Sequence, residues 1–364
     1  MTYNTIERIY KPSKQVLESY ILKGQPFIAT GVVNEWPAYK LWSSNHDYLV
    51  KKLGEKEIPI REIGYNVGEW LGKTTTLKFS QFWKLWTKHF NNPDNAANET
   101  PQFYLASLPV HKYFKEIETD FTIPDLPKEQ GKNANLWIGL KGQVTPLHHD
   151  WSSGDPGMDG LHAVVCGKKL FKLYDPSLNL KCFKRKSEWG LFHHALVDDV
   201  ENPNLDMFPE VKNAVGIDAV IEQGEMLFIP KLWWHHVRTL EPSISLNFWF
   251  QDIGSEFLKC DRYLGVIEHY LEAVYNMQVQ DSKLKTLIQF FDPPAQGQQV
   301  TDEKVEEFKR NPILFVSLPK FISSFSNAVN NPIFKNHPEK ERFKKEMTKK
   351  IEEWVVKKRE SLNP

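Results

Sequence analysis

Two histidines and an aspartate occur in segments that could present them to one metal ion. His148 and Asp150 lie two residues apart in TPLHHDW, and His235 lies in EQGEMLFIPKLWWHHV. Residues i and i+2 of a strand point to the same face, so His148 and Asp150 can reach the same ion. Two histidines and one carboxylate form the facial triad of non-haem Fe(II) oxygenases, which leaves coordination positions open for other ligands.

Each segment alone also has an ordinary interpretation. Among 12 histidines, an HxD pair at the surface or in a turn is expected by chance about as often as not. The apolar run before His235 suits a buried ligand, but it also suits a histidine satisfied at the end of a strand. Together the segments favour a metal site, because the strands of a barrel converge on one interior.

A 2-oxoglutarate cosubstrate would chelate such an iron through its keto group and C1 carboxylate, and its C5 carboxylate would need a buried cation. The segment GKKLFKLYDP supplies Lys168, Lys169 and Lys172. In a strand Lys168 and Lys169 face opposite sides, so only one can point inward, where a lysine is costly unless an anion pairs with it. From the residues alone, exposure of all three lysines is an equally good interpretation.

The segment SISLNFWF alternates strictly between two kinds of side chain. Asn247 and Trp249 share one face with Ser243 and Ser245, while the apolar residues take the other face. A face that carries Asn and Trp either meets solvent or lines a cavity. Because an exposed tryptophan is unfavourable, we expect this face to line a cavity.

The elements that must position these residues are mainly short strands. Between about 100 and 252 the β-rich runs are QFYLAS, NLWIGL, GLHAVVCG, KKLFKLYDP, DAVIEQGEMLFIP and SISLNFWF, separated by turn residues. This spacing is typical of an all-β sandwich or barrel. Helices are predicted over 13–23, with Ser13 as N-cap, and over 79–90, whereas Pro37 is predicted to interrupt regular structure.

After residue 253 the pattern becomes helical. Apolar stripes at helical spacing occur within 264–274 and 343–355, with Lys and Glu elsewhere. We therefore expect a catalytic domain with N-terminal helical elements over 1–252 and a helical extension over 253–364. The extension could form a homodimer, although such a stripe more often serves simple packing.

Composition limits the partners and the compartment. The 46 basic and 46 acidic residues leave no net charge, so no bulk attraction to nucleic acid is expected. The three cysteines include no CxxC pair, which favours a reducing, intracellular (cytoplasmic) compartment. The polar start of the chain and the lack of a long apolar run predict neither a signal peptide nor a membrane span.

Five segments occur in an order typical of a known family. They are PFIATGVVNEWPAYKLW, NLWIGLKGQVTPLHHD, GKKLFKLYDP, GEMLFIPKLWWHHV and LNFWF, all within 26–252. The chain resembles the JmjC family, in its cupin-8-like branch of asparaginyl hydroxylases and small JmjC hydroxylases. The resemblance implies a mainly β fold with a double-stranded β-helix (jelly-roll or cupin) core, and Fe(II), 2-oxoglutarate and O2 as cofactor and cosubstrates.

The resemblance also assigns residues. It implies that His148, Asp150 and His235 bind iron, with His235 preferred to His236 because the family's ligand directly follows the aromatic pair. It implies that Lys169 pairs with the C5 carboxylate of 2-oxoglutarate. The other pocket positions that match the family are Thr145, Tyr104, Asn247 and Trp249.

One segment departs from the family pattern. WSSGDPGMDG at 151–160 is longer than usual, and Gly160 falls near a position where the family often has Asn. The segment either shapes substrate entry or is an ordinary surface insertion. His162, just after it, either faces the pocket or has a structural role.

The predicted activity is that of a 2-oxoglutarate-dependent dioxygenase that hydroxylates a C–H bond. The first candidate substrate is a protein side chain. A free amino acid, a small metabolite or a tRNA base are the alternative substrates, and oxidation of an N-methyl carbon would lead to demethylation. A different class of function is a metal-binding cupin without turnover. The triad and Lys169 argue against this hypothesis. A zinc hydrolase would need a nearby catalytic carboxylate, and no HExxH-like arrangement occurs.

Overall fold

The fold is taken from a computed structural model of the chain. It describes residues 5–43, 46–63, 74–91, 102–124, 134–150, 158–176, 178–179, 182–184, 193–197, 199–250, 271, 275, 284–286, 288–289, 292, 294, 298–311 and 340–362. The chain divides into two compact units. One comprises 1–152, 156–182 and 197–252, and the other comprises 153–155, 183–196 and 253–364.

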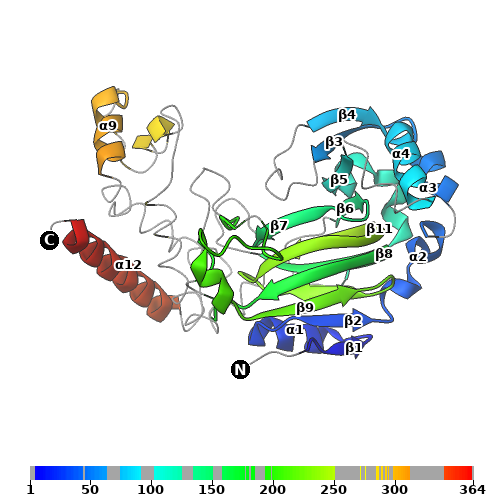
Figure 1. The fold of residues 1–364 in the computed structure, drawn as a ribbon, viewed down its shortest axis with the longest axis horizontal. Coiled ribbons are helices and arrows are strands. Elements are labelled where there is room, and N and C mark those ends of the chain that lie inside the picture. Colours follow the sequence, from blue (N-terminus) through cyan, green and yellow to red (C-terminus); the bar gives the residue numbers. More distant parts are fainter. Residues whose placement is uncertain are drawn as a thin grey trace. The chain divides into compact units, whose positions relative to one another are not determined.

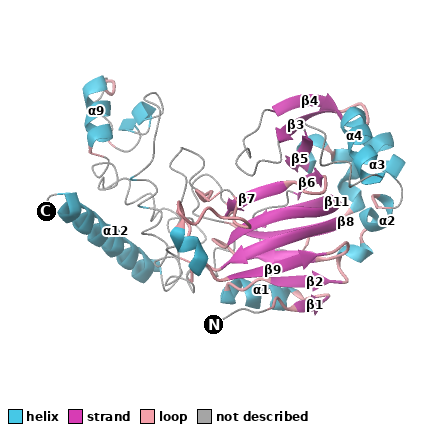
Figure 2. Cartoon of the chain, viewed as in Figure 1, coloured by secondary structure: helices cyan, strands magenta, loops and turns pink. Residues whose placement is uncertain are grey.

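The first unit is built on an 11-stranded sheet (Figures 1 and 2). Its strands are β1 (Arg8–Tyr10), β2 (Phe27–Thr30), β3 (Glu57–Ile63), β4 (Thr74–Lys78), β5 (Gln102–Pro109), β6 (Ala134–Gly139), β7 (Val144–His148), β8 (Asp159–Tyr174), β9 (Gly216–Ile221), β10 (Met226–Ile229) and β11 (Trp234–Phe250). Their order is β1-β2-β10-β8-β11-β6-β5-β3-β4, while β7 pairs with β11 and β9 pairs with β8. Apart from β1 with β2, every pairing is antiparallel. The predicted mainly β fold is confirmed.

Strands β8 and β11 pair with each other over nearly their whole length and lie side by side in Figure 1. The first half of β8 also pairs with β10 and the second half with β9. Strand β11 pairs with β7 near its start and with β6 toward its end. The runs GLHAVVCG and KKLFKLYDP, predicted as separate strands, are therefore one long strand that takes part in both halves of the sheet.

Strands β8 and β11 are both irregular where Gly167 of β8 faces Pro242 of β11. Gly167 has φ +78°, and a Cβ added there would lie 2.1 Å from the carbonyl oxygen of Pro242. Strand β11 shifts register between Thr239 and Ser245, on either side of that proline. Because only glycine allows this conformation and this close approach, Gly167 lets the two strands stay paired where their other partners change.

Helices cover the sheet's edges and one end. They are α1 (Lys14–Lys23), α2 (Pro37–Leu41), α3 (His46–Leu53), α4 (Phe79–Asn91) and α5 (Val110–Tyr113), with short 3-10 helices η1 (Val33–Glu35), η3 (Lys115–Asp120) and η4 (Pro209–Asn213). The helix predicted over 13–23 is confirmed, since the Ser13 side chain accepts from the Val16 N–H. The predicted interruption at Pro37 is present, since η1 ends at Glu35 and the extended Trp36 separates it from α2. Proline begins α2, because its fixed φ and missing N–H suit the first turn of a helix.

Aromatic side chains attach α4 to the sheet. Phe79, Phe82, Trp83 and Trp86 are all buried, which confirms the predicted amphipathic helix. The Trp86 indole N–H donates to the Gly139 carbonyl at 3.0 Å. The helix is thus fixed to the end of β6 by both packing and a buried hydrogen bond.

The regular elements described in the second unit are helices. It contains α9 (Asp302–Arg310) and α12 (Lys340–Leu362), and in α12 the side chains of Ile351, Trp354 and Val355 are buried. Part of the stripe predicted within 343–355 therefore serves packing inside this unit, while most of 264–274 lies outside the described residues. Among the helices that the structure describes, none combines the length and the apolarity that crossing a membrane requires.

The left-handed conformation of Gly167 generates a stability prediction. Gly167→Ala should lower the free energy of unfolding by about 2 kcal/mol or more, because it forces a side chain into the left-handed region against a backbone oxygen. The neighbouring Lys168→Ala is the control. It removes ion pairs of a solvent-accessible lysine with Glu222 and Glu241, which water screens, and should leave the free energy of unfolding nearly unchanged. Urea unfolding followed by circular dichroism measures both variants. Equal effects would contradict the requirement for glycine at position 167.

Candidate metal and cosubstrate site

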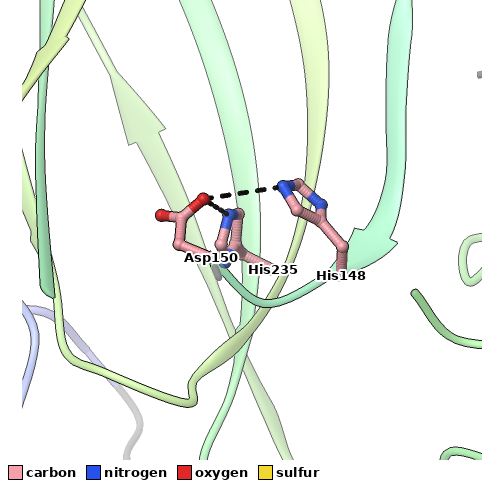
Figure 3. A group of neighbouring side chains, drawn as sticks. All are labelled: His148, Asp150 and His235. Atoms are coloured by element: carbon pink, nitrogen blue, oxygen red, sulfur yellow. Dashed lines mark ion pairs between the residues drawn. The ribbon is translucent and has the colours of Figure 1, made fainter. Parts of the chain in front are cut away.

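The structure brings His148, Asp150 and His235 together. His148 ends β7 and faces His235 across the β7–β11 pairing, and Asp150 follows two residues later. The Asp150 Oδ1 atom lies 3.9 Å from His148 Nε2 and 3.7 Å from His235 Nε2. Figure 3 shows the two ring nitrogens and the carboxylate directed at one another. One ligand atom from each residue lies within 4.8 Å of the others, which suits a single ion.

Backbone carbonyls orient both imidazoles. The Nδ1 atom of His148 lies 2.7 Å from the Pro146 carbonyl oxygen, and Nδ1 of His235 lies 3.1 Å from the Trp233 carbonyl oxygen. A carbonyl only accepts, so each ring donates its proton from Nδ1. The lone pair is then on Nε2, the atom that faces Asp150 in both rings, as a metal ligand requires.

Burial sets the charge state of the site. It lowers the pKa of His148 to about 3, helped by the neighbouring His235 and opposed by Asp150. His148 is therefore neutral at physiological pH, the form that binds metal. Burial also raises the pKa of Asp150, against the opposing effects of His148 and Trp249. A buried carboxylate beside the imidazoles of His148 and His235 is stabilised by a cation.

The Trp249 indole fixes the Asp150 carboxylate, and Gly160 leaves room for the pair. The Trp249 side chain hydrogen-bonds this carboxylate, and an indole can only donate. At Gly160 an added Cβ would lie 3.3 Å from Asp150 Oδ2 and 3.5 Å from Trp249 Cδ1. The absence of a side chain at the position where the family often has Asn therefore makes room for this pair. The neighbouring stretch 151–157 lies outside the described residues.

Lys169 lines the same pocket as His148, Asp150 and His235. It is 1% exposed, whereas Lys168 on the opposite face pairs with Glu222 and Glu241. The Lys169 ammonium lies 5.9 Å from the ring centroids of both Tyr104 and Trp137. Among the described residues no carboxylate pairs with it, and burial alone lowers its pKa to about 7. Such a lysine lacks the anion that its burial calls for.

All the remaining predicted residues line this pocket. The lining comprises Tyr104, Trp137, Thr145, His148, Asp150, Gly160, Leu161, His162, Lys169, Phe171, Ile229, His235, Val237, Asn247 and Trp249. The predicted alternation in SISLNFWF is thus observed, with Asn247 and Trp249 facing the cavity and Leu246 and Phe248 in the core. Thr145 and Tyr104 hydrogen-bond to each other.

Sequence reasoning missed Trp137 and left His162 open. The Trp137 indole donates to Asn247 Oδ1 at 2.7 Å and so orients that amide. His162 is 9% exposed and lines the pocket, and its Nε2 has no hydrogen-bond partner among the described residues. The strand pattern could have found both, since Trp137 pairs with Ser245 and His162 with Asn247 across β11.

The fold is that of a cupin-type protein, and His148, Asp150 and His235 are placed where they could hold a single metal ion. The model of the cupin-like domain matches residues 13–256, and the chain belongs to this family. It is 49% identical to JmjC domain-containing protein C of Dictyostelium discoideum over 98% of both chains. The predicted membership of the JmjC family is thereby confirmed, which places the chain among Fe(II)- and 2-oxoglutarate-dependent oxygenases.

More distant relatives carry names for different reactions. The chain is 33% identical to Lysine-specific demethylase JMJ30 of Arabidopsis thaliana, over 68% of this chain and 56% of that protein. It is 28% identical to tRNA wybutosine-synthesizing protein 5 of Danio rerio, over 60% of this chain and 67% of that protein. The more particular resemblance to asparaginyl hydroxylases stays a prediction.

The contact between Trp249 and Asp150 generates a binding prediction. Trp249→Phe removes the indole donor and should weaken Mn(II) binding by about 10-fold to 100-fold, because partners of metal ligands hold them in position. Asp150→Asn should abolish measurable binding, and Asp218→Asn, at an exposed residue of β9, is the control. Anaerobic titration calorimetry measures the affinities. Unchanged affinity in Trp249→Phe would show that the indole does not support the metal site.

Proposed function

We propose that the protein hydroxylates a C–H bond, with a protein side chain as the first candidate substrate. The observation that carries the proposal is one pocket lined by both the His148, Asp150 and His235 cluster and the buried Lys169. A metal-binding cupin without turnover has no need of a buried lysine that lacks an anionic partner.

The side chains that line the pocket fit Fe(II) and 2-oxoglutarate. The two imidazoles and the carboxylate would hold Fe(II), and Lys169, with the Thr145 and Tyr104 hydroxyls, would hold the far carboxylate of 2-oxoglutarate. When bound, these groups activate O2 so that one oxygen atom enters succinate, with loss of CO2, and the other enters the substrate.

The chain's own contribution is binding, orientation and exclusion of water. The Trp137 indole holds the Asn247 amide at the pocket wall, and Trp249 holds Asp150. Leu161, Phe171 and Ile229, all buried, make part of the wall apolar. An apolar wall strengthens the attraction between Lys169 and a bound carboxylate, because less water screens it.

Other outcomes of the same chemistry are distinguished by the product. Oxidation of an N-methyl carbon would end in demethylation, which the demethylase name of one relative brings into consideration. The name of the tRNA wybutosine-synthesizing relative makes a tRNA base an alternative substrate. Free amino acids and small metabolites are further alternatives. A homodimer through the C-terminal helices stays a prediction.

Turnover tests the proposed reaction. The protein with Fe(II) and 2-oxoglutarate should release succinate, more rapidly in the presence of substrate, and His148→Ala should abolish the release while Asp218→Asn preserves it. Peptides, amino acids and tRNA treated in parallel are then analysed by mass spectrometry. Gain of one oxygen supports hydroxylation, and loss of a methyl group supports demethylation instead. Normal succinate release by His148→Ala would contradict the assignment of the site.

The depressed pKa of Lys169 generates a pH prediction. Burial lowers this pKa to about 7, and a bound carboxylate requires the ammonium form and so raises it. Above about pH 7 the binding of 2-oxoglutarate must therefore take up a proton, and the affinity should fall by up to about tenfold per pH unit. In the unliganded protein the same group makes stability rise with pH between about 7 and the ordinary value of 10.5, since the unfolded chain there holds the proton.

Calorimetry of 2-oxoglutarate binding to the Mn(II) protein, in buffers of different ionisation enthalpy, measures both the affinity and the proton uptake. Lys169→Arg keeps its charge throughout the range, so any binding that it retains should lose this pH dependence. Affinity that is constant from about pH 6.5 to about pH 8.5, without proton uptake, would show that Lys169 does not hold the carboxylate.

A further inference from the structure

A second cluster of potential ligands lies on the other face of β11. His236 directly follows His235, so its side chain points away from the pocket. It meets Asp199 and Glu201, which precede β9 in the segment that follows β8. One ligand atom from each of the three residues lies within 4.8 Å of the others, and His236 Nε2 lies 3.9 Å from Glu201 Oε2.

His236 is the unusual member of this cluster. Its side chain is fully buried, and neither ring nitrogen has a hydrogen-bond partner among the residues that the structure describes. A buried polar group without a partner is destabilising, so such groups call for an explanation. Here the imidazole points at two carboxylates instead of at apolar side chains, and an ion between them would satisfy it.

Both carboxylates are held in place by other groups. Asp199 Oδ1 accepts from the backbone N–H groups of Glu201 and Asn202, at 2.9 and 3.2 Å. Arg238 Nε donates to Glu201 Oε2 at 2.6 Å. Metal-binding carboxylates are commonly hydrogen-bonded in this way. The contacts of the Glu201 carboxylate with Arg238 and His236 all use Oε2, which leaves Oε1 for an ion.

Charge also favours a cation. The carboxylates of Asp199 and Glu201 carry two negative charges, of which Arg238 offsets one. Lys172, the residue opposite His236 on β8, is paired with Asp218. A divalent ion would therefore meet a net negative and largely buried environment, where its attraction to the ligands is weakly screened.

We propose that Asp199, Glu201 and His236 bind a second divalent metal ion, of the zinc class, separate from the catalytic site. One imidazole and two carboxylates suit zinc, whereas magnesium and calcium prefer oxygen ligands alone. Three protein ligands leave a fourth position for water. The ion would fasten the segment around 199–201 to β11, the strand that also supplies His235.

Zinc stoichiometry in the full chain tests this site. The background variant is His148→Ala with Asp150→Ala, which removes the first site. After dialysis against buffered zinc, mass spectrometric metal analysis should find about one zinc ion per chain in this background. Adding His236→Gln or Glu201→Gln should reduce it to near zero, whereas adding Asp206→Asn, at an exposed acidic residue of the same segment, should leave it unchanged.

A second readout covers variants that fold poorly. Zinc should raise the melting temperature of the background variant in a concentration-dependent way, because it binds only the folded chain. Glu201→Gln keeps an acceptor for Arg238, so it should fold in metal-free buffer and yet show no zinc-dependent shift. Absence of zinc from the background variant, or zinc retained after both His236→Gln and Glu201→Gln, would overturn the proposal.

Discussion

The pairing of β8 with β11 is the constraint on which the site depends. It sets Lys169 opposite Thr239, His162 opposite Asn247, and His235 beside the second half of β8. Because side chains alternate between faces, a slip of one residue would turn Lys169 or His235 out of the pocket. The irregularity at Gly167 and Pro242 keeps both strands in register while their other neighbours change. The positions of Lys169 and His235 are therefore set by one strand pair.

Local patterns predicted much of this arrangement. The spacing of His148 and Asp150 placed both on one face, and the alternation in SISLNFWF placed Asn247 and Trp249 together. The choice of Lys169 over Lys168, and of His235 over His236, came from the family resemblance, and the structure places the chosen residues in the pocket. The spacing and the alternation follow from a period of two along a strand, which is visible in the sequence itself, whereas the two choices needed the resemblance.

Other features depend on contacts between distant segments. That GLHAVVCG and KKLFKLYDP form one strand could not be predicted. The glycine between them is typical of a turn, and only its close approach to Pro242 of β11 explains why the strand continues. The space at Gly160 exists only because Asp150 and Trp249 meet there. The second histidine of WWHH had no evident role, since Asp199 and Glu201 reach it from a loop without a strand pattern.

The central claim is that one pocket binds a metal ion at one part and a dicarboxylate's far end at another. A crystal structure of the protein with Mn(II) and 2-oxoglutarate, with anomalous diffraction to locate the metal, tests it most directly. We predict Mn(II) bound by His148, Asp150 and His235, and a 2-oxoglutarate carboxylate on the Lys169 ammonium. Metal bound away from these three side chains, or Lys169 without contact to the cosubstrate, would contradict the account.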